Sequence, residues 1–278
     1  METPLFFKNG RSNRLFGILH SVDSQDEPSP HKIALVYCHP LFEEQQLSHR
    51  ISVNFARYLT MHGCCVFRFN YFGDGESDGL FEEASIESRV EDIQAAITEV
   101  QRRLQPEMIF LLGLRAGATL ALLAAEKCQE IMGVVNWAPI VNMGEYVYNV
   151  LRENMSTQIV VHKKVLFNRE KLIEQINKGL FVDIKGYNLG NPLYKQALGI
   201  NISKKTFNTA MSFLFIQISN IQKVEKQLEE LKQTFEPCDV TIKTVSEQKM
   251  WVPQKMVYPT YSDLFSTTLS WIKEKAAL

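Results

Sequence analysis

The sequence lacks several features that would point to a membrane or to nucleic acid. It has no apolar run approaching the roughly 18 residues needed to span a bilayer. Its first residues lack the basic segment and following apolar segment of a secretory signal. Charge is balanced, because 30 Lys and Arg oppose 31 Asp and Glu. We therefore expect a cytoplasmic protein with no transmembrane segment and no nucleic-acid partner.

Cysteine is also scarce, and the five cysteines are scattered and odd in number. This excludes a disulfide framework and matches no zinc-site spacing, so we interpret them as reduced and mostly buried thiols. The sequence contains no Walker loop and no dinucleotide-binding fingerprint. We therefore expect no cofactor and no metal.

Apolar runs alternate with amphipathic helical stretches along most of the 278 residues. This pattern is typical of an α/β fold with a mostly parallel central sheet and helices on both faces. The expected strands span 14–20, 32–39, 64–70, 108–113, 132–137, 211–219 and 240–245. The expected helices span 50–61, 85–104, 116–127, 221–234 and 261–275.

Residues 141–205 break this alternation. They contain helical patches at 144–153 and 170–178 and a turn-rich piece, GYNLGNPLY, but no convincing buried strand. We predict that residues 1–140 and 206–278 form the core and that 141–205 form a helical lid or cap, because ligands bind outside the carboxyl ends of parallel strands. Structural decoration or a dimer surface is the alternative. The polar stretch 23–31 is expected to be a loop.

The stretch LLGLRAGATLALLAAE, residues 111–126, joins a predicted strand to a predicted helix. Gly113 and Gly117 have the spacing of a nucleophile elbow, G-x-S-x-G, in which a strained turn presents the central residue above the sheet. Arg115 occupies the position of the nucleophile. The sequence therefore predicts the turn but not its usual chemistry.

Two further loops follow predicted strands. His39 and Pro40 stand where related folds carry an oxyanion loop, and Pro40 has no N–H to donate. The backbone N–H groups of Leu41 and Ala116 could still point at one spot. The stretch FNYFGDGESDG, residues 69–79, is suited to a tight loop.

These residues resemble the α/β-hydrolase superfamily. The motifs that carry the resemblance are His39-Pro40 with Glu43-Glu44, the loop 73–79, and Gly113-Leu114-Arg115-Ala116-Gly117. The chain is most similar to serine-aminopeptidase-type hydrolases, especially the exosortase A system-associated branch. That resemblance implies an α/β-hydrolase fold with a lid, and an association with exopolysaccharide production.

The three positions of the hydrolase triad are not filled. A guanidinium at position 115 stays charged and is no nucleophile. The sequence after 211–219 reads ISNIQ, without a carboxylate, and after 240–245 it reads SEQKMW, without a histidine. The last histidine is His162, inside the predicted lid. We therefore predict no catalytic residue and a degenerate triad.

Two interpretations of Arg115 stay open. It is either a structural plug neutralised by Glu43, Glu44, Asp74 or Glu247, because a buried cation needs a partner, or the site of a small anionic or acyl ligand. The expected ligand-binding residues are Arg115, His39, Leu41, Ala116, Glu43 and Glu44. Aromatic residues of the lid could line the pocket or pack the lid on the core.

Two classes of function follow from this pattern. The first is a non-hydrolytic pseudoenzyme that binds a small acyl or carbohydrate-related molecule, or a protein partner. The partner could be a second copy of this chain in a homodimer. The second is an active esterase, thioesterase or acyltransferase with relocated catalytic groups.

Ser77 is the candidate for a displaced nucleophile, although a hydroxyl that caps a turn is the commoner role. Cys38 and His39 are neighbours that would point to opposite faces of a strand.

Overall fold

The computed structural model describes residues 1–22, 32–221, 223–253 and 260–277, and the predicted loop 23–31 lies outside these ranges. Eight of the described strands form one sheet in the order β1-β2-β4-β3-β5-β6-β9-β10. The β1–β2 and β2–β4 pairs are antiparallel, and the other pairs are parallel. The strands are β1 (Glu2–Lys8), β2 (Arg14–His20), β3 (Ile33–Cys38), β4 (Cys64–Phe69), β5 (Met108–Leu114), β6 (Ile131–Trp137), β9 (Ser212–Ile218) and β10 (Asp239–Val245).

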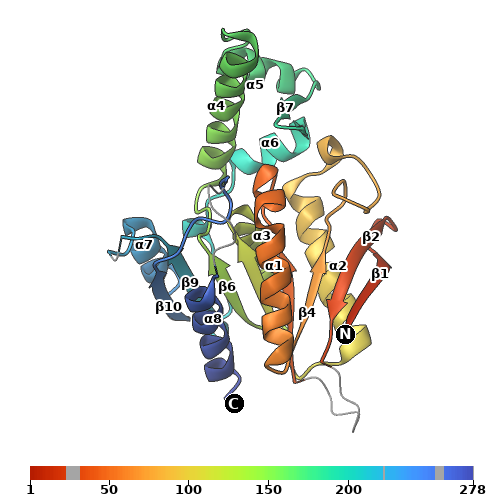
Figure 1. The fold of residues 1–278 in the computed structure, drawn as a ribbon, viewed down its shortest axis with the longest axis vertical. Helices are drawn as coiled ribbons and strands as arrows, with labels where there is room; N and C mark the ends of the chain where they lie inside the picture. The colour runs from red at the N-terminus through yellow and green to blue at the C-terminus, as the bar shows by residue number, and fades with distance from the viewer. Residues whose placement is uncertain (23–31, 222, 254–259, 278) are drawn as a thin grey trace.

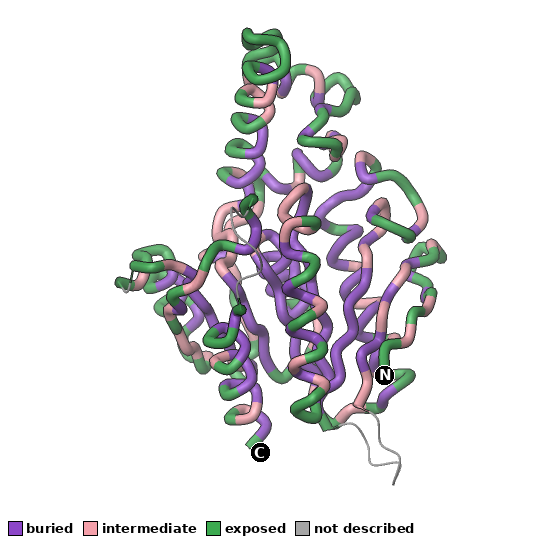
Figure 2. The backbone as a smooth tube through the Cα atoms, in the orientation of Figure 1, coloured by how far each residue is buried: buried purple, intermediate pink, exposed green. Residues whose placement is uncertain are grey.

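Helices cover both faces of the sheet (Figure 1). Side chains of α1 and α8 join one apolar cluster with one face of the strands, and side chains of α2, α3 and α7 join a second cluster with the other face. The central strands are buried on both faces and therefore read as continuous apolar runs (Figure 2). The bounds of these helices are α1 (Glu43–Met61), α2 (Ile86–Leu104), α3 (Ala116–Ala125), α7 (Lys226–Thr234) and α8 (Ser262–Lys275).

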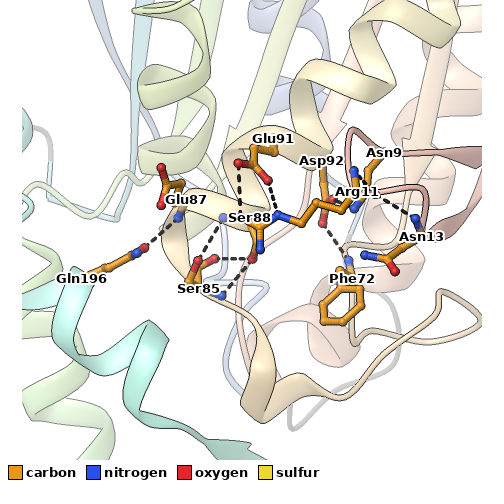
Figure 3. Close-up of polar contacts among 10 residues, drawn as sticks. All are labelled: Asn9, Arg11, Asn13, Phe72, Ser85, Glu87, Ser88, Glu91, Asp92 and Gln196. Atoms are coloured by element: carbon orange, nitrogen blue, oxygen red, sulfur yellow. Dashed lines mark hydrogen bonds and ion pairs between the residues drawn. The ribbon is translucent and has the colours of Figure 1, made fainter.

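Residues 141–205 form a separate group of elements above the sheet (Figure 1). Gln196 of this group accepts a hydrogen bond of 2.8 Å from the backbone N–H of Glu87, which anchors the group to the first turn of α2 (Figure 3). Its elements are α4 (Met143–His162), α5 (Arg169–Asn177), β7 (Val182–Ile184), β8 (Tyr187–Leu189), α6 (Asn191–Leu198) and the 3-10 turn η2 (Ile202–Lys204).

A buried carboxylate fixes the loop that follows β4. Asp92 of α2 accepts one 2.8 Å hydrogen bond from the Asn9 side chain and another from the Phe72 backbone N–H (Figure 3). Burial raises the pKa of Asp92, and these two donors oppose that rise. These bonds hold the β1–β2 turn, α2 and the loop after β4 together. They thereby fix the position of Asp74, which follows Phe72 by two residues.

Four expectations about secondary structure were wrong. β1 is an additional strand, whose Pro4 and mostly exposed side chains hide it as a sheet edge. α1 begins at Glu43 rather than near 50, with Glu43 and Glu44 in its first turn, where acidic side chains are favoured by the helix dipole. Within 141–205, a short hairpin of β7 and β8 is present, and part of the turn-rich piece forms α6.

Two helices also differ from their predicted bounds, one at its start and one at its end. α7 begins at Lys226 rather than at 221, and α4 continues to His162, beyond the predicted end at 153.

Among the helices that the structure describes, none combines the length and apolar character needed to cross a membrane.

Candidate functional site at the strand-to-helix turn

The turn between β5 and α3 has the geometry of a nucleophile elbow. Arg115 adopts φ 55 and ψ −122, a conformation that non-glycine residues rarely hold. Its backbone N–H donates to Trp137 O at 2.9 Å. A Cβ on Gly117 would lie 2.1 Å from Cys38 O, and one on Gly113 would lie 2.3 Å from Ala118 Cα. Both glycines therefore allow backbone segments to approach closely, as the sequence predicted.

The guanidinium of Arg115 has a carboxylate partner. Its Nε donates to Glu44 Oε1 at 3.2 Å, and the Tyr146 hydroxyl donates to Glu44 Oε2 at 3.3 Å. The Arg115 guanidinium carbon also lies 4.8 Å from the ring centroid of Trp251, a cation–π contact. Burial raises the pKa of Glu44, and the charge of Arg115 opposes that rise. The strained turn thus presents a cation that is already paired.

The other three acids considered as partners of Arg115 have different roles. Glu43 contacts Lys185 of the β7–β8 turn at 2.5 Å. Asp74 binds Arg89 of α2 at 2.7 Å in the core. Glu247 accepts hydrogen bonds from the first backbone N–H groups of α8 and so caps that helix. Glu44 is therefore the acid that neutralises the elbow.

A cavity of about 460 Å³ opens beside Arg115, between the carboxyl ends of the strands and α4. Its walls include Phe42, Ile140, Tyr146 and Trp251 together with the polar side chains of Asn142 and Asn149. Among the described residues that line it, acids outnumber bases, and the charged ones are Glu43, Glu44, Glu145, Glu153, Glu225, Arg115 and Lys185. This described lining therefore carries a net negative charge, in spite of the cation at the elbow.

Besides Arg115, two other non-glycine residues near the cavity have a left-handed backbone conformation. Phe42, just before α1, has φ 55, and Ala138, just after β6, has φ 44. Phe42 and Arg115 line the cavity, and Ala138 precedes Pro139, which also lines it. Left-handed conformations of non-glycine residues persist only where the surroundings impose them, and they occur often at binding and catalytic sites.

The structure brings only some of the predicted ligand-binding residues to this cavity. Arg115, Glu43 and Glu44 line it, whereas Leu41 and Ala116 are almost completely buried outside its lining. His39 is also buried and lines a different cavity, described below. Ligand binding by these six residues stays a prediction.

His39 has no proton-transfer partner among the residues that the structure describes. Its Nδ1 lies 2.8 Å from Pro40 O. Its Nε2 makes no hydrogen bond with a described residue, and Asp74 Oδ2 lies 3.9 Å from this nitrogen. Burial lowers the pKa of His39 from 6.5 to about 4. The imidazole is therefore neutral at physiological pH.

This depressed pKa predicts a pH-dependent stability. The unfolded chain takes up a proton near pH 6.5, whereas the folded chain does so only near pH 4, so the free energy of unfolding should fall as the pH drops across this window. We expect the His39 contribution to be up to about 3 kcal/mol. Urea denaturation of the wild type and of His39→Gln between these pH values measures it. An equally steep pH dependence in His39→Gln would contradict this assignment.

The groups after β9 and β10, and the other nucleophile candidates Ser77 and Cys38, have structural contacts or are buried. Asn220, after β9, accepts a hydrogen bond of 3.1 Å from the hydroxyl of Ser246, which follows β10. Ser77 donates to Asn70 O at 2.8 Å and accepts from the Phe16 N–H at 3.0 Å, as expected of a hydroxyl that fixes a turn. Cys38 is buried, which raises the pKa of its thiol.

Sequence reasoning missed two residues of this site. Trp251 and Lys185 have no recognisable motif, and each reaches the site from a loop far away in the sequence. Tyr146 is one of the lid aromatic residues that were expected either to line the pocket or to pack the lid on the core, and it lines the cavity. No group of three or more His, Cys, Asp or Glu in the described ranges could hold a metal ion.

Comparisons with known proteins agree with this geometry. The sequence profile of the family described as serine aminopeptidase, S33, matches residues 29–180. No protein of curated function matches the chain significantly.

Solved structures of α/β hydrolases superpose on nearly the whole chain. Est1E from Butyrivibrio proteoclasticus, solved with ferulic acid bound, is 14% identical, has a TM-score of 0.69, and covers 99% of this chain and 100% of its own. The alpha/beta hydrolase GrgF from Penicillium sp. sh18 is 16% identical, with a TM-score of 0.66 and coverage of 100% of both chains. Alpha/beta hydrolase domain-containing protein 10 from mouse is 13% identical, with a TM-score of 0.61, and covers 98% of this chain and 99% of its own. At these identities the likeness shows the fold alone.

Proposed function

The chain belongs to the serine aminopeptidase S33 family of α/β hydrolases, and from this premise we propose that it binds a small carbohydrate-related molecule without hydrolysing it. The observation that carries the proposal is the pairing of Arg115 with Glu44 at 3.2 Å in the strained turn. A nucleophile would have to stand at that position, and a paired guanidinium cannot act as one.

The character of the cavity supports a hydroxyl-rich ligand over an anionic one. Arg115 already has a carboxylate partner, and the surplus of glutamates around the cavity would repel a carboxylate or phosphate. Carboxylates and amides are good hydrogen-bond partners for sugar hydroxyls, and aromatic rings such as Trp251 and Tyr146 provide apolar surface. An acyl anion at Arg115 is therefore the less favoured ligand.

The segment 141–205 is proposed to act as the lid of this cavity. Tyr146, Asn149 and Val150 of α4 and Ile184 and Lys185 of the β7–β8 hairpin line it. The contact of Lys185 with Glu43 joins the hairpin to α1 across the cavity. An association with exopolysaccharide production, as in the exosortase A system-associated branch, would suit a carbohydrate-related ligand and is part of this proposal.

The proposal predicts a selective loss of binding in a variant of the lid. Asn149 is exposed, lies on α4 and lines the cavity, so Asn149→Ala removes a hydrogen-bonding amide without emptying the core. We expect affinity for a neutral oligosaccharide to fall about three- to tenfold, the effect of one lost hydrogen bond. Calorimetry with a panel of neutral oligosaccharides and of fatty-acid anions measures it.

Ser156→Ala, a change of an exposed residue on the same helix away from the cavity lining, is the matched control and should leave affinity unchanged. Binding of fatty-acid anions that is lost in Arg115→Gln would favour the acyl-anion interpretation instead. Turnover of an ester by the wild type would favour the alternative, an active esterase, thioesterase or acyltransferase with relocated catalytic groups.

A further inference from the structure

A second cavity of about 240 Å³ lies on the face of the sheet that α1 covers. It shares no lining residue with the cavity beside Arg115. Strands β2 and β4, helix α1 and the loop after β4 contribute its walls. We call it the Arg68 cavity, after the cation of β4 that lines it together with Tyr37, His49, Ser52 and Glu76.

Arg68 is a buried cation whose charge is poorly compensated. It is only 9% exposed, in a strand whose other side chains are almost all apolar. Its Nε donates to His20 Nε2 at 3.1 Å, and no described carboxylate lies within ion-pair distance of its guanidinium. The Glu2 carboxylate lies 3.5 Å from His20 Nδ1, so the His20 imidazole stands between it and Arg68. Glu2 is already paired with Arg57. The two terminal nitrogens of Arg68 make no hydrogen bond within the described ranges.

A guanidinium in this position is costly unless something neutralises it. Burial of most of an unpaired cation is unfavourable, and it lowers the pKa of Arg68, whose terminal nitrogens are not among the fully buried atoms. His20 cannot supply a counter-charge, because a neutral imidazole only accepts the hydrogen bond.

The surrounding groups suit an oxyanion. Burial raises the pKa of Tyr37, so its phenol keeps the proton that it could donate. His49 stands on the exposed side of α1, and burial and the charge of Arg68 lower its pKa. The arginine fork presents parallel N–H groups that match the two oxygens of a carboxylate or phosphate.

We propose that the Arg68 cavity binds a small oxyanion, a carboxylate or a phosphate, through the terminal nitrogens of Arg68. Its volume accommodates such a group together with several water molecules, each of which occupies about 30 Å³. Glu76 is exposed and lines the same cavity, so it disfavours ligands of high negative charge. The proposal is independent of any ligand at the elbow.

Titration with acetate and with inorganic phosphate at constant ionic strength, followed by amide NMR, tests this site. In Arg68→Gln we expect the affinity of the bound anion to fall at least about tenfold, as charge-assisted hydrogen bonds are lost. In Glu76→Gln it should rise about two- to threefold, the effect of one screened like charge. Arg115→Gln should leave it unchanged, which separates this site from the elbow.

Binding of acetate alone or of phosphate alone supports the site and identifies the class of oxyanion. The absence of binding to either anion in the wild type would overturn the proposal, as would equal affinity in Arg68→Gln. If Arg68→Gln does not fold, Glu76→Gln decides, since unchanged or weaker affinity in that variant contradicts an anion in this cavity. Loss of binding in Arg115→Gln would instead assign the anion to the elbow.

Discussion

Replacing Asp74 by alanine is expected to lower the free energy of unfolding by about 3 to 5 kcal/mol, the cost of leaving a buried charge without its partner. Asp74 is 4% exposed and Arg89 is fully buried, with 2.7 Å between Asp74 Oδ2 and Arg89 Nη1. Arg89 Nε and Nη2 already lack hydrogen-bond partners in the described part of the chain. Without Asp74, the contacts that the described residues leave to the guanidinium are cation–π contacts with the rings of Tyr71 and Phe81 and a longer-range interaction with Asp92.

Urea denaturation of a double-mutant cycle measures this effect. The double variant Asp74→Ala/Arg89→Met removes both charges and should recover most of the lost stability, because an apolar replacement of a buried pair is often neutral. Asp78→Ala, in the same loop but with an exposed arginine partner, should destabilise far less. A loss in Asp74→Ala no larger than that in Asp78→Ala would contradict the assignment of a buried pair.

Gly117→Ala is expected to destabilise the chain by about 3 kcal/mol or more, at the upper end of overpacking effects. The added Cβ would lie 2.1 Å from Cys38 O and 2.5 Å from His39 O. Both oxygens belong to backbone at the end of β3, so no side-chain rotation can relieve the contact. The elbow or the strand would have to move, and the Arg115–Glu44 contact would move with it.

Gly199→Ala is the matched control for this substitution. Gly199 follows α6 at φ −88, and the nearest atom to an added Cβ is Gln196 O at 3.7 Å. We expect a change within about 1 kcal/mol, in the stabilising direction if the reduced freedom of the unfolded chain dominates. Thermal and urea denaturation compare the two variants. Equal stability of Gly117→Ala and the parent would contradict the close packing of the elbow against β3.

The fold was largely predictable because its central strands are buried on both faces. β3, β4 and β5 therefore appear as uninterrupted apolar runs, and the spacing of Gly113 and Gly117 fixes the turn after β5. β1 lacks this signal, because Phe7 is its only fully buried side chain. α6 was missed because Gly190 and Pro192, which read as turn residues, stand at its N-terminus, where both are well tolerated.

The site was only partly predictable, because its contacts join distant segments. Four acids were equally plausible partners of Arg115 in the sequence, and only the start of α1 at Glu43 places Glu44 beside it. Trp251 approaches the guanidinium from the loop after β10, without any local pattern. Arg68 lies within an apolar run that predicts a buried strand correctly but hides a buried cation.

The intact mass of the protein after incubation with a fluorophosphonate probe tests the central claim most directly. An activated serine would form a covalent adduct, whereas an elbow occupied by Arg115 paired with Glu44 offers no such group. We predict that the mass stays unchanged under conditions in which a catalytically active serine hydrolase is fully labelled. A stoichiometric adduct on any serine would contradict a non-hydrolytic role for this chain.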